Sequence, residues 1–103
     1  MNVPFDRRRD RRLGRRLPVS LPARMETLDG DIDARCIELG SDGRALRSDY
    51  VPRAGEHIVI AIQAPDVGGQ PSAPLRVKAE VRRCNSVGGG LYEIGFRIVE
   101  RHG

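Results

Sequence analysis

Hydrophobic and polar side chains alternate along most of the chain from residue 17 onward. In the first such segment, apolar residues occupy every second position: Leu17, Val19, Leu21, Ala23 and Met25. A period of two predicts a strand with one face buried. Pro18 and Pro22 both fall on the opposite face and have no N–H to donate. This strand is therefore expected to be irregular or to lie at an edge.

Five further segments have the composition of strands: residues 32–39, 57–63, 75–82 and 91–100, and a short strand that begins at Ala45 and Leu46. Glycine, proline and aspartate separate them, at Asp29-Gly30 and at residues 40–43, 52–55, 64–71 and 85–90. No segment has a helical stripe. Six short strands with this punctuation indicate an antiparallel barrel or sandwich, and closure into a barrel removes exposed edges. We therefore expect an all-β fold, a small six-stranded antiparallel barrel.

The expected core is aliphatic, because tryptophan is absent and aromatic residues make up 4% of the 103 residues. This length fits one domain. Three strands place their apolar residues on one face: Ile58, Ile60 and Ile62; Val77, Ala79 and Val81; Tyr92, Ile94, Phe96 and Ile98. In residues 32–39, Ile37 and Leu39 fall on the same face of the expected strand. Cys36 and Cys84 lack metal-ligand spacing, and we expect buried or half-buried thiols.

Positive charge is concentrated at the N-terminus. Residues 1–16 hold seven of the 18 lysines and arginines and two of the 14 acids, which leaves 11 basic and 12 acidic groups elsewhere. The basic character is thus a property of an arm, residues 1–16, attached to a nearly neutral body, residues 17–103. This asymmetry favours an anionic ligand captured at one end of the molecule. We expect the arm to be flexible.

Arginine suits such a ligand, because its planar fork of donors binds phosphate bidentately and its flat face stacks on a base. Arg12 and Arg16 are at most about 13 Å apart in an extended chain, so a bend lets both reach one ligand. The alternative interpretation of the same charge is a solvated tail without a specific partner.

Several functional classes lack support in the sequence. No apolar stretch approaches the roughly 20 residues of a membrane span, and no apolar segment typical of a secretion signal follows the basic N-terminus. The cytoplasm is the expected location. His57 and His102 are far apart, and no catalytic triad, paired carboxylates, metal-ligand set or phosphate loop is evident. We expect no enzyme activity, no metal and no cofactor.

Three motifs resemble those of the PilZ domain family. Residues 10–19, DRRLGRRLPV, resemble its opening, in which an Arg-xxx-Arg motif precedes the first strand; Arg12 and Arg16 are the matching arginines. Residues 38–43, ELGSDG, fall where the family has Asp/Asn-x-Ser-x-x-Gly. Only Gly43 is kept there, since Glu38 replaces Asp or Asn and Gly40 replaces Ser. Residues 77–83 and 92–100 resemble the closing hairpin.

The resemblance implies a six-stranded barrel that binds cyclic di-GMP, a bacterial second messenger with two phosphates and two guanines. It assigns Arg12 and Arg16 to phosphates and guanine stacking, and Gly43 to close approach of the backbone to the ligand. Glu38 can still accept hydrogen bonds from guanine, and Ser41 can substitute for the hydroxyl that Gly40 lacks. Further contacts are expected from two neighbouring residues of the first motif, Arg11 and Arg15.

Three hypotheses follow. The first is a non-catalytic receptor whose arm changes conformation on binding cyclic di-GMP and so regulates an unidentified protein partner. The second is a degenerate PilZ-like interaction module that does not bind the nucleotide, based on the two departures in the second motif. A nucleic-acid-binding barrel is the least favoured. The chain has only four aromatic residues for base stacking, and Tyr92 and Phe96 share the parity of the core.

Overall fold

Six antiparallel strands make up most of the described part of the chain. The structure, a computed structural model, describes residues 16–63, 68–69 and 73–102. The strands are β1 (Arg16–Thr27), β2 (Gly30–Gly40), β3 (Gly43–Ser48), β4 (His57–Ile62), β5 (Leu75–Gly88) and β6 (Leu91–His102). No helix long and apolar enough to cross a membrane occurs among these described residues. The expected all-β fold with six antiparallel strands is confirmed.

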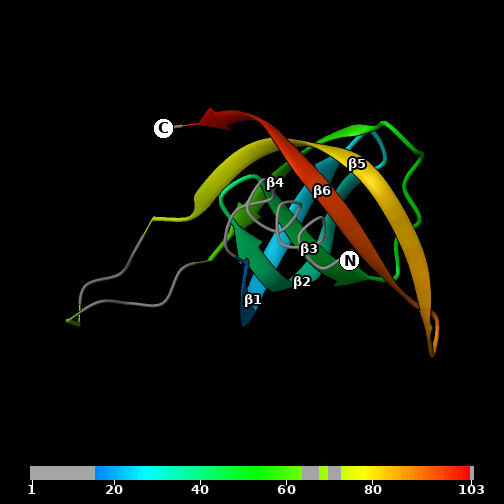
Figure 1. The fold of residues 1–103 in the computed structure, drawn as a ribbon, viewed down its shortest axis with the longest axis horizontal. Helices are drawn as coiled ribbons and strands as arrows, with labels where there is room; N and C mark the ends of the chain where they lie inside the picture. Colours follow the sequence, from blue (N-terminus) through cyan, green and yellow to red (C-terminus); the bar gives the residue numbers. More distant parts are fainter. Residues whose placement is uncertain (1–15, 64–67, 70–72, 103) are drawn as a thin grey trace, which may run out of the picture.

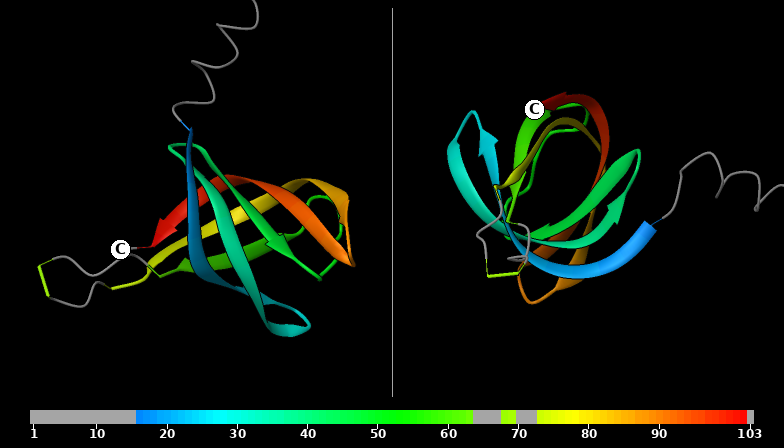
Figure 2. Two further views of the ribbon diagram at one scale, coloured as in Figure 1. Left: turned by 90° about the horizontal axis from the view of Figure 1, so that it is seen from below. Right: turned by 90° about the vertical axis from the view of Figure 1, so that its left-hand side faces the viewer.

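The sheet closes on itself in the order β1-β2-β3-β6-β5-β4, a closed barrel in which β1 also pairs with β4. Strands β5 and β6 form a hairpin that crosses over the other strands (Figure 1). Two perpendicular views show how the strands wrap around a common interior (Figure 2). The barrel therefore offers an inner face, which forms the core, and an outer face along the same strands.

The expected irregularity of β1 is present. Its register with β2 shifts between Pro18 and Leu21, where the proline N–H groups are missing from the ladder. Pairing with β4 is confined to residues 23–26 of β1. The first seven residues of β1 therefore have β2 as their paired neighbour, and Arg16 lies at this partly open end.

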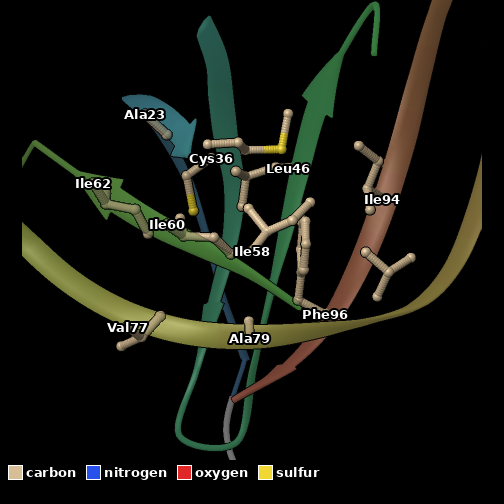
Figure 3. Close-up of a cluster of buried hydrophobic side chains, with 12 residues drawn as sticks. Ala23, Cys36, Leu46, Ile58, Ile60, Ile62, Val77, Ala79, Ile94 and Phe96 are labelled. Atoms are coloured by element: carbon tan, nitrogen blue, oxygen red, sulfur yellow. The ribbon is translucent and has the colours of Figure 1, made fainter. Parts of the chain in front are cut away.

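The core is aliphatic, as predicted. The isoleucines of β4 and Val77, Ala79 and Val81 of β5 are at most 4% exposed. They meet Met25, Cys36, Leu46, Ile94 and Phe96 in the interior, and Figure 3 shows these side chains converging from the surrounding strands. Burial of this apolar area, at roughly 25 cal/mol per Å², is the main force that closes the barrel.

The 85–90 segment differs from its prediction as a turn. Strand β5 continues to Gly88, with Asn85 opposite Glu93 and Ser86 opposite Tyr92, so only Gly89 and Gly90 form the turn. All three glycines have positive φ, which gives the tight reversal that ordinary residues resist. Backbone pairing thus outweighed the weak strand preference of Asn and Ser.

Two other strands also depart from their predicted pattern. Strand β3 runs from Gly43 to Ser48 and so starts two residues before the predicted start at Ala45. One of the two additional positions is Arg44, a buried arginine whose charge does not suggest an inward strand position. In β2, a register shift between Cys36 and Glu38 moves the core positions from Cys36 to Leu39. Such a bulge exchanges the inward and outward positions along the strand. The alternating pattern of Ile37 and Leu39 in the sequence did not reveal this exchange.

Both cysteines are free thiols, as expected; Cys36 is buried and Cys84 is half-buried. Burial raises the pKa of the Cys36 thiol, against a smaller lowering by its hydrogen bond to the Glu38 backbone. Burial also raises the pKa of Cys84. Both groups are therefore protonated and weakly nucleophilic near neutral pH.

Candidate anion-binding site

A pocket of about 500 Å³ lies where the start of β1 meets β3, β5 and β6. This volume is typical of small-molecule sites, which measure roughly 300–1,000 Å³. Arginines dominate its lining: Arg16, Asp42, Gly43, Arg44, Arg82, Arg83, Gly95, Phe96, Arg97 and Ile98. Five cationic side chains and one carboxylate indicate a site for an anion.

Arg16 and Glu38 connect the two ends of this site. Arg16 pairs with Gly40 across the β1–β2 ladder, and Pro18 pairs with Glu38, so Arg16 and Glu38 project from the same face. Arg16 Nη1 donates to Glu38 Oε1 at 2.8 Å, with both side chains about one-third exposed. Arg16, which belongs to the first motif, is therefore held by Glu38, which replaces Asp or Asn in the second motif.

Small residues form the floor beside this ion pair. Ala45 lies opposite Glu38 on β2 and opposite Gly95 on β6. It is buried although it is not part of the interior cluster, so side chains on the outer face cover it. A side chain at Gly43 would lie 2.5 Å from the backbone oxygen of Phe96. Glycine is thus required at position 43 for the close approach of β3 to β6, whatever its part in ligand binding.

A bulge in β5 adds two arginines. The register of β5 with β6 shifts between Val81 and Arg83, and Arg82 and Arg83 both line the pocket. Consecutive residues of a regular strand would point to opposite faces, and the bulge changes this. Glu80 restrains two of the neighbouring cations, since its Oε1 lies 3.1 Å from Arg97 Nη2 and 3.6 Å from Arg82 Nη1.

Two arginines hold the backbone of the turn at residues 40–43. Nη1 of Arg44 donates to the carbonyls of Gly40 and Gly43, and Arg101 donates to the carbonyl of Ser41. Burial lowers the pKa of Arg44, and its Nε has no hydrogen-bond partner among the described residues. The second motif is thus fixed by hydrogen bonds to its backbone carbonyls. The family motif has short polar side chains at positions 38 and 40.

The predicted site residues are only partly brought together. Arg16 and Gly43 line the pocket. Glu38 reaches it through Arg16, while Gly40 and Ser41 lie beside it and use their carbonyls for Arg44 and Arg101. Three of the predicted arginines lie outside the described residues: Arg11, Arg12 and Arg15.

Four arginines of the lining were not predicted from the sequence: Arg44, Arg82, Arg83 and Arg97. The near-neutral charge of residues 17–103 concealed them, because the sheet gathers distant arginines at one place. The adjacent pair Arg82-Arg83, at the end of an otherwise alternating strand, was the available signal.

The comparisons with known proteins agree with this architecture. The PilZ domain family matches residues 6–102. A solved structure described as the Bacillus subtilis inhibitor of motility MotI/DgrA has a similar fold, with a TM-score of 0.72 and 18% sequence identity. The similarity covers 91% of this chain and 44% of that one, so the chain spans less than half of its length. A search of curated proteins found no match. Because the family match extends over nearly all of the sequence, the chain belongs to the PilZ domain family.

Proposed function

We propose that this domain is a non-catalytic receptor for cyclic di-GMP that binds the nucleotide in the arginine-lined pocket. The observation that supports this most is the convergence of both motifs on one pocket, with Arg16 and Gly43 in its lining. PilZ domains form a family of cyclic di-GMP receptors. Arginines there would meet the two phosphates with charge-assisted hydrogen bonds, and their planes would stack on guanine.

Arg16 would supply the described half of the first motif, and Arg12 the other half from the arm. Glu38, Gly40, Ser41 and Gly43 would supply the second side of the site, with Arg11 and Arg15 as further contacts. The arm is continuous with β1 at Arg16. A ligand that binds both the arm and the barrel would therefore change the position of the arm relative to the barrel. That change is the proposed signal to a protein partner in the bacterial cytoplasm.

Calorimetric titration of the full chain with cyclic di-GMP tests the proposal. At about 100 μM protein, a Kd of tens of micromolar is detectable. We expect saturable heat from the wild type and strong loss of binding in Arg12→Ala and Arg16→Ala. Absence of heat in the wild type, or affinity unchanged by both substitutions, would contradict it.

A second candidate function is a protein-interaction module that does not bind the nucleotide. The observation in its favour is the 2.8 Å pair between Arg16 and Glu38, because a ligand phosphate must compete with this carboxylate for the arginine. This candidate predicts no change in amide chemical shifts on addition of cyclic di-GMP, together with a partner recovered by the unliganded domain. Low-micromolar nucleotide binding would exclude it.

A further inference from the structure

Arg83 differs from the other arginines of the pocket in its hydrogen bonding. Arg16 is paired with Glu38, while Arg82 and Arg97 share Glu80. Arg44 is buried and uses Nη1 for two backbone carbonyls. Over the described ranges 16–63, 68–69 and 73–102, the guanidinium of Arg83 has neither an ion pair nor a hydrogen bond.

Arg83 is exposed, and its side chain lies against β6. It lies opposite Gly95 in the β5–β6 ladder. A Cβ placed on Gly95 would lie 3.0 Å from Cγ of Arg83 and 3.2 Å from both Cζ and Nε. The side chain therefore lies along the β6 backbone, in the space that the missing side chain of Gly95 leaves open.

This arrangement favours an anionic ligand at Arg83. A phosphate that binds Arg16, Arg82 or Arg97 must displace or share a carboxylate, whereas Arg83 has donors that are not used by the described residues. Among the exposed arginines of the lining, Arg83 is thus the one where an anion competes least with carboxylates for the guanidinium donors.

We infer that Arg83 is a further ligand-binding residue, outside both sequence motifs, which binds a phosphate group of the nucleotide in the pocket. Gly95 is its positioning residue, because a side chain at position 95 would force the Arg83 side chain to shift. This inference rests on the proposed cyclic di-GMP site and adds to it a contact from the closing hairpin. The site then holds its ligand between β1 and the β5–β6 hairpin.

Titration of matched arginine variants with cyclic di-GMP tests the role of Arg83. Loss of a charge-assisted hydrogen bond predicts that Arg83→Ala binds about 10-fold more weakly than the wild type. Arg83→Lys keeps the charge without the planar fork and should recover only part of the loss. The control is Arg53→Ala, which removes one exposed arginine outside this lining and should bind within about twofold of the wild type.

Gly95→Ala provides an independent test that keeps all charges. Its Cβ meets a flexible side chain rather than the backbone, so the melting temperature should remain near that of the wild type. Its affinity should fall, because the Arg83 side chain must shift away from the added Cβ.

Three results would overturn the inference. Wild-type affinity in Arg83→Ala, alongside lost binding in Arg16→Ala, would remove Arg83 from the site and leave the proposed function standing. An equal loss of affinity in Arg53→Ala would show that the effect comes from the overall charge of the protein and not from the position of Arg83. A wild-type protein that does not bind cyclic di-GMP would overturn the proposed function itself, and the assignment of Arg83 with it.

Discussion

Arg16 and Glu38 form a 2.8 Å ion pair that joins the first residue of β1 to β2. The pair connects Arg16, which matches the first family motif, to Glu38, which departs from the second. Its charges are partly exposed, so its contribution to folding is small, on the order of 1 kcal/mol or less. Its larger consequence concerns the ligand, because Glu38 holds the arginine that a phosphate would need.

Restoring the family residues at positions 38 and 40 should strengthen nucleotide binding. Glu38→Asp shortens the carboxylate by one methylene, which weakens its hold on Arg16, and Gly40→Ser supplies a hydroxyl. Each recovered hydrogen bond contributes about 0.5–1.5 kcal/mol, so the double variant should bind about 5- to 150-fold more tightly. Calorimetry with cyclic di-GMP measures this. Weaker binding by the double variant would show that Glu38 and Gly40 suit the present site better.

Gly43→Ala should destabilise the fold directly. The added Cβ would lie 2.5 Å from the Phe96 oxygen, and neither backbone can move without disturbing the β3–β6 ladder. We expect a loss of about 1–3 kcal/mol in the free energy of unfolding, measured by urea denaturation. Gly95→Ala is the control, since its Cβ meets a movable side chain. Equal stability of the two variants would contradict the steric role of Gly43.

Glu80 should contribute to stability in a pH-dependent way. The hydrogen bond from Arg97 is the main cause that lowers the pKa of Glu80. A carboxyl with a lowered pKa in the folded state stabilises the fold above its unfolded pKa of about 4.3, and this contribution is lost as the pH falls through the folded pKa. Glu80→Gln should therefore lower the Tm slightly at pH 7 and leave it unchanged at strongly acidic pH. A Tm difference independent of pH would contradict the ionic role.

The two thiols should differ in their reactivity. Cys84 is half-buried, whereas Cys36 is buried in the core, and access to the thiolate controls the rate of modification. Ellman's reagent at pH 8 should modify one thiol of the native protein slowly and the second only after urea is added. Cys84→Ser should abolish the slow native phase. Rapid modification of both thiols in the native protein would argue against the buried position of Cys36.

The sequence by itself determined that there are six strands and which faces of β1, β4, β5 and β6 point inward. Alternation places Ile58, Ile60 and Ile62 in the core, because a strand has a period of two and burial of apolar area is the main driving force. Pro18 and Pro22 likewise indicated the irregularity of β1, since the missing N–H groups are local properties. The motifs pointed to Arg16 and Gly43, which both line the pocket.

Only the tertiary structure decided the composition of the pocket. Arg44, Arg83 and Arg97 are far apart in the chain, and strand register brings them together. The bulge between Val81 and Arg83 cannot be read from alternation, because it interrupts the alternation itself. The pairing of Glu38 with Arg16 also depends on which residues face each other across β1 and β2. Charge counted along the chain therefore revealed the arginine arm, while the arginines of the pocket became evident only in the closed sheet.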